Sequence, residues 1–264
     1  MSETLVDRYD ALLIDLDGTV YRGSEAVPGA AEAVAQARAK GVGIRYVTNN
    51  ASRSPQAVAD HLVELGFDTS IDEVSTSAQA GAAMLAERLP ARTNVLVLGT
   101  EALQAEVLKR GLTPVDTAEH ATAVLQGLST DLGWRELAEA AVAIRGGALW
   151  VACNVDVTLP TERGLLPGNG SLVAALKAAT DAEPLVAGKP ATPLLQQAAK
   201  DLGAHRPLVI GDRLDTDILG AVNAGMDSLL VLTGVSTEQE AQALPEDQRP
   251  TYVGADLSVL HRLP

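Results

Sequence analysis

The chain runs from the apolar stretch Ala11-Leu12-Leu13-Ile14 directly into Asp15-Leu16-Asp17-Gly18-Thr19. An apolar run without polar alternation is typical of a parallel-sheet strand that is buried on both faces. Acids at the carboxyl end of such a strand lie where open α/β sheets form their ligand crevice. Because side chains alternate along a strand, Asp15 and Asp17 point to the same side. Two like charges this close favour a divalent cation, although a solvated acidic turn accounts for this motif alone equally well.

Polar residues also follow other apolar runs of the chain. Thr48 ends one run, Asp212 ends another, and Lys189 lies in a loop ahead of an expected helix. The carboxyl ends of parallel strands share one edge of a sheet, so we expect these side chains to converge with Asp15. Acids, a hydroxyl and an ammonium together suit phosphoryl transfer, in which cations and hydrogen-bond donors offset the phosphate charge.

Strand and helix patterns alternate along the chain, which predicts an α/β protein with a doubly wound, Rossmann-like parallel sheet. Residues 80–183 hold their own alternating series, so we expect an inserted α/β domain there and a discontinuous core over 1–79 and 184–264. The expected helices cover 28–40, 54–66, 101–110, 134–144 and 216–224, and a short hairpin or flap is expected over 18–27.

Composition excludes several classes of partner. The 264 residues carry a formal net charge of −14 and only 3% aromatic residues, which argues against nucleic acid and anionic membranes. The chain start lacks a signal pattern and no apolar stretch approaches a membrane span, so a cytoplasmic location is expected. Cys153 is the single cysteine, and we expect it to be a small buried apolar residue.

The chain resembles the haloacid dehalogenase (HAD) superfamily of phosphatases, whose four motifs occur here in order. The matching residues are Asp15-Leu16-Asp17-Gly18-Thr19, Thr48-Asn49-Asn50, Lys189, and Gly211-Asp212-Arg213-Leu214-Asp215-Thr216-Asp217. Residues 80–183 have the position of that superfamily's larger α/β cap. Within this segment, the stretches that resemble the NagD-like branch are Asn154-Val155-Asp156 and Leu166-Pro167-Gly168-Asn169-Gly170. The resemblance implies a HAD core with an inserted cap and a homodimer formed through the cap.

The resemblance also implies roles for the acids. Asp15 would be the nucleophile that forms an aspartyl-phosphate, and Asp17 would act as general acid and base. One Mg²⁺ would lie between Asp15, the backbone carbonyl of Asp17 and Asp212 in an all-oxygen shell. Asp217 would orient Lys189 or a metal-bound water.

The remaining motif residues would contact the substrate. Thr48 and the turn residues Asn49 and Asn50 would hold phosphate oxygens, while Lys189 would supply a compact positive charge. In the cap, Asn154 and Asp156 would either contact the substrate or serve as turn residues. Two arginines flank the second and fourth motifs and would either neutralise substrate charge or form surface ion pairs; they are Arg53 and Arg213.

The substrate expected from the resemblance is a small phosphorylated metabolite. The likeness, including residues 160–168, is nearest to bacterial glycerol-3-phosphate phosphatases, so glycerol 3-phosphate comes first. The alternatives within the family are a UMP-type nucleotide, phosphoglycolate or an aryl phosphate. A phospho-accepting signalling module is an alternative of another class, since receiver domains also use strand-end acids, a Thr and a Lys. Receiver domains are much shorter than this chain and have no inserted domain.

Overall fold

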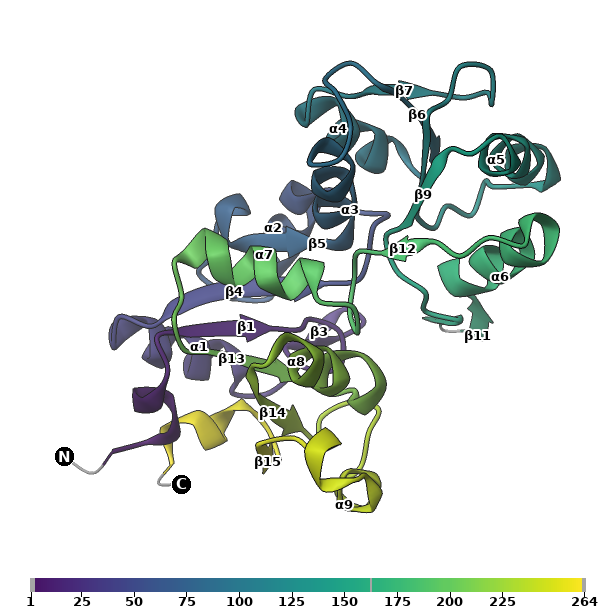
Figure 1. Ribbon diagram of the computed structural model, residues 1–264. Helices are drawn as coiled ribbons and strands as arrows, with labels where there is room; N and C mark the ends of the chain where they lie inside the picture. The colour runs from purple at the N-terminus through teal and green to yellow at the C-terminus, as the bar shows by residue number, and fades with distance from the viewer. Residues whose placement is uncertain (1–2, 162, 263–264) are drawn as a thin grey trace. The chain divides into compact units, whose positions relative to one another are not determined.

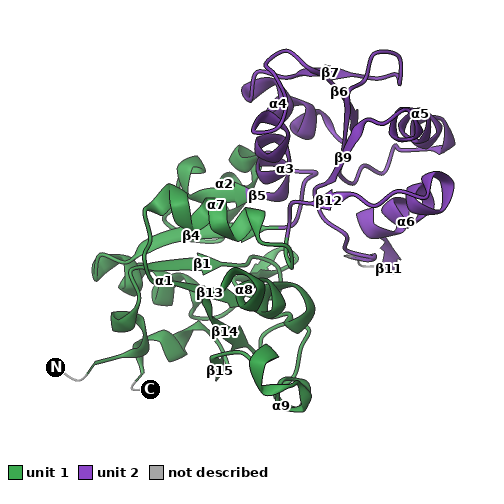
Figure 2. Ribbon diagram, viewed as in Figure 1, with its two compact units in different colours: residues 1–48, 55–75, 189–264 green, residues 49–54, 76–188 purple. Residues whose placement is uncertain are grey.

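The computed structural model describes residues 3–161 and 163–262, and it divides into two compact units (Figures 1 and 2). Unit 1 comprises residues 1–48, 55–75 and 189–264, and unit 2 comprises residues 49–54 and 76–188. The predicted domain division at 79/80 and 183/184 falls inside unit 2, a few residues from its ends, and stays a prediction. Glu162, part of the stretch that resembles glycerol-3-phosphate phosphatases, lies outside the described residues.

Unit 1 is built on a sheet that has six strands among the described residues, in the order β15-β14-β13-β1-β4-β5. These strands are β1 (Ala11–Ile14), β4 (Gly43–Thr48), β5 (Val74–Thr76), β13 (Pro207–Gly211), β14 (Asp227–Val231) and β15 (Tyr252–Gly254). Strand β1 pairs in parallel with both β4 and β13. The strand order therefore reverses between β1 and β13, which is where open α/β sheets bind their ligands.

Helices cover both faces of this sheet, as the doubly wound pattern predicts (Figure 1). The helices of unit 1 are α1 (Ala30–Ala39), α2 (Pro55–Glu64), α7 (Pro193–Leu202), α8 (Leu219–Ala224) and α9 (Glu238–Ala243). Helices α1 and α2 bury their apolar residues against one face, while α7 packs on β1 and β4 from the other. Both α2 and α7 start at a proline, whose missing N–H costs nothing in the first turn.

A short hairpin follows the first acidic motif, as expected for residues 18–27. It pairs β2 (Tyr21–Arg22) with β3 (Glu25–Ala26) in antiparallel register. The expected helix over 216–224 is instead two pieces, a π-helical turn over Leu214–Ile218 and then α8. In this wider turn the amide of Ile218 donates to the carbonyl oxygen of Arg213 at 3.1 Å, five residues earlier.

Unit 2 has its own three-layer α/β arrangement. Its described sheet has the order β12-β9-β8-β6-β7, with strands β6 (Asn94–Leu98), β7 (Thr113–Val115), β8 (Ala123–Gln126), β9 (Leu149–Ala152) and β12 (Leu185–Val186). Its helices are α3 (Ser77–Ala86), α4 (Glu101–Lys109), α5 (Trp134–Arg145) and α6 (Asn169–Thr180). Helices α5 and α6 pack on one face, α3 and α4 on the other. A separate exposed hairpin pairs β10 (Thr158–Thr161) with β11 (Gly164–Pro167).

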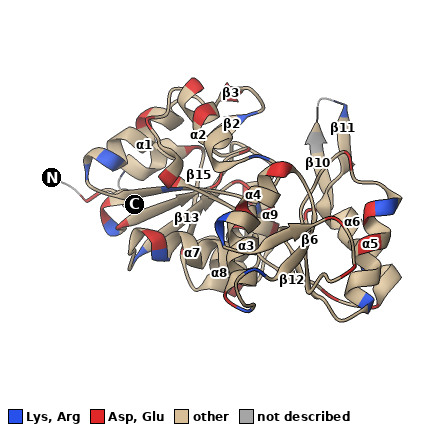
Figure 3. Cartoon of the chain, turned by 90° about the horizontal axis from the view of Figure 1, so that it is seen from above, with Lys and Arg blue, Asp and Glu red and all other residues tan. Residues whose placement is uncertain are grey.

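Charged residues lie mainly on helices and loops of both units, with Lys and Arg interspersed among the more numerous Asp and Glu (Figure 3). Among the described residues, no helix combines the length and the apolar character that crossing a lipid bilayer requires.

Two neighbouring positions on α2 test how the core of unit 1 is packed. Leu62 is fully buried, whereas Val63 is 55% exposed. Leu62→Ala should lower the free energy of unfolding by about 2–5 kcal/mol, because it leaves a cavity among close-packed side chains. Val63→Ala should change it by less than about 0.5 kcal/mol. Chemical denaturation of both variants measures the difference, and equal losses would contradict this assignment of the buried face.

Candidate active site

The centre of the site in unit 1 is the ammonium group of Lys189, whose side chain is only 2% exposed. Its Nζ donates to Asp15 Oδ1 at 2.5 Å, to Asp217 Oδ1 at 2.7 Å and to the carbonyl oxygen of Val47 at 3.3 Å. Burial alone lowers the pKa of a lysine, but the two carboxylates outweigh it and raise the pKa of Lys189 above its ordinary value. The lysine is therefore charged.

Asp15 directly follows β1 and lies against this ammonium. Burial, followed by the nearby charge of Asp217, raises the pKa of Asp15 above its ordinary value, and Lys189 opposes this shift. The hydroxyl of Thr19, four residues on, reaches Asp15 Oδ2 at 3.4 Å. Thr19 is the last residue of the acidic motif, and the turn at Gly18 brings its hydroxyl back to the carboxylate.

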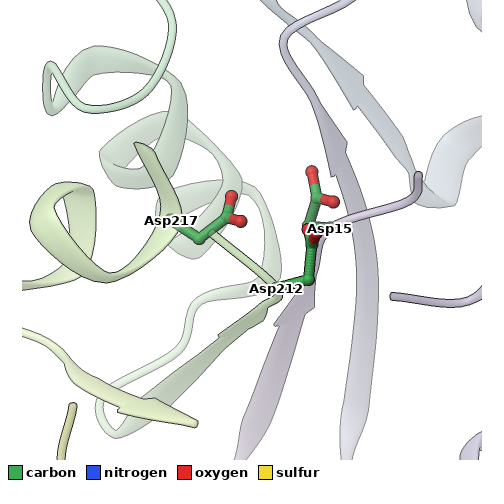
Figure 4. A group of neighbouring side chains, drawn as sticks. All are labelled: Asp15, Asp212 and Asp217. Carbon is green, nitrogen blue, oxygen red and sulfur yellow. The ribbon is translucent and has the colours of Figure 1, made fainter. Parts of the chain in front are cut away.

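In the described part of the chain, Asp15, Asp212 and Asp217 form a group whose carboxylate oxygens lie within 4.8 Å of one another. Figure 4 shows Asp15 and Asp212 at the ends of their strands and Asp217 on the following turn, facing them. Asp212 is 1% exposed, and its Oδ1 is buried with no hydrogen-bond partner among the described residues. Burial, then the charge of Asp217, raises the pKa of Asp212 to about 6. An acceptor left without a donor is a position suited to a cation.

Asp217 is placed by the wide turn that precedes α8 and by Gly211 at the end of β13. Its Oδ2 accepts a hydrogen bond from the amide of Arg213 at 3.1 Å, while Oδ1 accepts from Lys189. A Cβ on Gly211 would lie 2.2 Å from Asp217 Cγ, so only glycine leaves room for the carboxylate.

Two other predicted residues of unit 1 differ in burial. Thr48 ends β4 and is 8% exposed, next to Val47, whose carbonyl Lys189 contacts. Asp17 is exposed and forms a backbone bridge with Tyr21. The group of neighbouring carboxylates contains Asp217 and not the side chain of Asp17. The metal contact expected of Asp17 is through its backbone carbonyl and stays a prediction.

The predicted residues Asn49, Asn154 and Asp156 come together within unit 2. The amide of Asn154 donates to the carbonyl oxygen of Asn49 at 2.7 Å, and its Oδ1 accepts from the Asp156 amide at 3.2 Å. The side chain of Asn49 donates to both carboxylate oxygens of Asp156 at 3.3 Å. Asn154 is 5% exposed, so its side chain ties one loop to the other. Asn50 accepts from the amide of Ser52 at 2.7 Å, closing the turn after Asn49.

The second NagD-like stretch, residues 166–170, is hydrogen-bonded to the loop that carries Asn154. Asn169, at the start of α6, donates to the carbonyl oxygen of Asn154 at 2.7 Å. A Cβ on Gly168 would lie 2.3 Å from the backbone oxygen of Asp156, and one on Gly170 would lie 2.2 Å from that of Val155. Glycine at both positions therefore lets the two backbone segments approach closely.

The sequence analysis also raised the roles of two arginines and of the single cysteine. Arg213 forms an ion pair with Asp215 at 2.7 Å, and Arg53 is exposed. Cys153 is buried, as expected, and burial raises the pKa of its thiol, which disfavours the nucleophilic thiolate.

Residues 12–113 match the family described as haloacid dehalogenase-like hydrolase, and residues 186–260 match one described as HAD-hydrolase-like. The chain belongs to the haloacid dehalogenase-like hydrolase family. This membership and the doubly wound α/β fold confirm the predictions made from the motifs.

Two similar proteins are a phosphatase and a 5′-nucleotidase by name. The chain is 53% identical over 261 residues to D-glycerol 3-phosphate phosphatase of Mycobacterium tuberculosis, covering 98% of this chain and 73% of the relative. It is 38% identical over 247 residues to 5′-nucleotidase YutF of Bacillus subtilis, covering 92% and 94% of the two chains. A crystal structure of glycerol phosphate phosphatase from Mycobacterium tuberculosis in complex with magnesium superposes with a TM-score of 0.95 at 53% identity. It covers 100% of this chain and 79% of that one.

Gly211→Ala tests whether the position of Asp217 matters. The added Cβ must displace the Asp217 carboxylate from Lys189, so we expect phosphatase kcat/KM to fall at least about tenfold. Gly133→Ala is the control, because its Cβ would meet only the flexible end of Glu136 at 3.3 Å. Comparable activity of Gly211→Ala and the parent protein would show that this carboxylate need not sit against the ammonium.

Proposed function

We propose that the protein is a Mg²⁺-dependent phosphatase that hydrolyses glycerol 3-phosphate through an aspartyl-phosphate on Asp15. The observation that carries the phosphatase chemistry is the buried Lys189 ammonium between two carboxylates, beside the unpartnered oxygen of Asp212. This arrangement holds a nucleophile and a fixed positive charge at one sheet edge. The substrate is proposed from the 53% identity to a D-glycerol 3-phosphate phosphatase.

The acids fit a magnesium ion. Carboxylate oxygens are the ligands that Mg²⁺ prefers, and those of Asp15 and Asp212 lie within 4.8 Å of each other. With its carboxylates ionised, the cluster together with the Lys189 ammonium would carry two negative charges, which one divalent cation balances. We assign the ion to Asp15, Asp212 and the backbone carbonyl of Asp17, with Asp217 holding Lys189. The bound ion would neutralise charge between the nucleophile and the phosphate.

The chain's own residues then divide the reaction into two displacements. A carboxylate oxygen of Asp15 attacks phosphorus, and Asp17 gives a proton to the departing alkoxide oxygen of the ester. Asp17 next takes a proton from the water that attacks the aspartyl-phosphate, which releases phosphate and restores the Asp15 carboxylate. The exposed position of Asp17 suits proton exchange with water. Lys189 stays charged throughout, and with Thr48 and the turn at Asn49 and Asn50 it would hold phosphate oxygens.

We further propose that unit 2 is the cap and that its loop 154–156 selects the substrate. Asp156, held by Asn49, presents a carboxylate that can accept hydrogen bonds from hydroxyl groups of a small polyol phosphate. Asn154 would influence the substrate indirectly, because its side chain joins the loop of Asn49 to the loop of Asp156 and so positions Asp156.

A homodimer through unit 2 and a cytoplasmic location stay predictions. The exposed Leu165 of the β10–β11 hairpin supports a dimer surface, which sedimentation equilibrium would test.

Asp15→Asn tests the nucleophile. The amide cannot attack phosphorus, so kcat for glycerol 3-phosphate should fall on the order of a thousandfold or more while the fold is retained. Asp60→Asn, a change on the surface of α2, is the matched control and should keep full activity.

The same phosphate-release assay, run on the parent protein with UMP, phosphoglycolate and an aryl phosphate, identifies the substrate. Higher kcat/KM for UMP than for glycerol 3-phosphate would replace the proposed substrate by a nucleotide.

The raised pKa of Asp212 predicts how pH affects magnesium binding. Its pKa rises from 3.8 to about 6 on folding, so the metal-free fold binds the extra proton and loses stability as pH increases through this window. Mg²⁺ requires the ionised carboxylate, so its stabilising effect should grow from pH 5 to pH 7. Melting temperatures with EDTA and with Mg²⁺ measure this.

Two variants serve as references for that pH series. Asp212→Asn should abolish the Mg²⁺-dependent rise in melting temperature at every pH. Asp215→Asn, which removes the ion pair with Arg213, should retain the rise and its pH dependence. A Mg²⁺ effect that is independent of pH would rule out Asp212 as the titrating ligand.

A further inference from the structure

We infer that residues Thr233–Ser236, here named the support loop, are a positioning element for the Asp212 carboxylate, with Thr233 as its anchor. The loop follows β14 and precedes α9, and no motif in the sequence pointed to it. The inference rests on the proposed magnesium site, because it assigns the loop the task of aiming one oxygen of Asp212 at the cation.

The support loop engages Asp212 twice. The amide of Val235 donates to Asp212 Oδ2 at 2.8 Å, and the amide of Ser236 donates to the backbone carbonyl of Asp212 at 3.0 Å. These bonds fix one carboxylate oxygen and leave Oδ1 buried without a partner among the described residues. The two oxygens therefore have separate tasks, one structural and one available to a ligand.

Two glycines enclose the bonded oxygen and restrict its movement. A Cβ on Gly234 would lie 1.9 Å from Asp212 Oδ2, and one on Gly18 would lie 2.4 Å from the same atom. Gly18 also has a positive φ of 86°, which other residues rarely adopt. The backbone of the support loop and that of the first acidic motif thus both approach the carboxylate closely.

Thr233 ties the support loop to the first motif. It is 8% exposed, and its hydroxyl donates to the carbonyl oxygen of Gly18 at 2.6 Å. Its own carbonyl accepts from Arg22 Nε of the β2–β3 hairpin at 2.5 Å. At the other end of the loop, Ser236 Oγ accepts from the amide of Leu214, where the wide turn begins. One short loop therefore connects the segments that carry Asp15, Asp212 and Asp217.

The test replaces Thr233 by valine, which keeps the shape of the side chain and removes the hydroxyl. Gly18 then loses its donor, and the amide of Val235 is free to shift from Asp212. Groups that orient a metal ligand are typically worth 10–100-fold in metal affinity. We therefore expect isothermal titration of the metal-stripped protein with MgCl₂ to give at least about tenfold weaker binding for Thr233→Val.

Two further variants separate positioning from ordinary loss of stability. Thr233→Ser keeps the hydroxyl and should restore Mg²⁺ affinity to within about twofold of the parent protein, a margin well inside the 10–100-fold effect. Thr237→Val removes the side-chain cap of α9, where Thr237 Oγ1 accepts from the Glu240 amide, and should lower stability without changing Mg²⁺ affinity.

The outcomes distinguish this inference from the proposed function. Equal Mg²⁺ affinity of Thr233→Val and the parent protein overturns the positioning role, as does an equal loss in Thr237→Val. A parent protein that binds no Mg²⁺ overturns the proposed magnesium site itself. Weakened binding in Thr233→Val alone, restored in Thr233→Ser, establishes the role of the support loop.

Discussion

The burial of one ammonium group dominates the architecture of unit 1. An ammonium that is 2% exposed is stable only when charged partners replace its water, and Lys189 obtains them from Asp15 and Asp217. Those acids come from opposite ends of the chain and meet because β1 and β13 are neighbours in the sheet. Removing either carboxylate would leave a buried charge poorly compensated, so the fold and the chemistry depend on the same ion pairs.

Asp212, the proposed metal ligand, is a buried carboxylate with an incomplete set of hydrogen bonds among the described residues. Asp212 is buried and lies near two other acids. Burial and the charge of Asp217 raise its pKa to about 6, so the ionised form is disfavoured in the absence of a cation. The support loop satisfies Oδ2 and leaves Oδ1 unsatisfied. A cation bound at the proposed site would supply the missing partner of Oδ1, which would link the stability of the metal-free fold to its affinity for the metal.

Much of the fold and of the acidic site could be predicted from the sequence. The features that could not be predicted have physical causes. The unbroken apolar run before Asp15 and the similar run before Asp212 predicted the parallel sheet, and the parallel sheet predicted where the acids converge. The support loop was missed because its bonds to Asp212 are made by backbone amides, which have no sequence signature. The helix expected over 216–224 includes the last three residues of the wide turn at 214–218, since the side-chain pattern of that turn differs little from that of an α-helix. The sequence leaves Asn154 open between a substrate contact and a turn residue, because a loop asparagine gives no sign of which group its amide will bond.

The strand order has a consequence for how the chain folds. Strand β1 lies between β4, which follows it closely in the sequence, and β13, which comes after all of unit 2. Until residues 207–211 are available, β1 is an edge strand with a fully apolar sequence, a state prone to pairing with other chains. During synthesis from the N-terminus, unit 2 can form before that edge is covered, whereas the core and its acidic centre must wait for the last fifth of the polypeptide. Asp15, the proposed nucleophile, is thus synthesised early, whereas the cluster of acids around it is complete only after Asp212 and Asp217 have been synthesised.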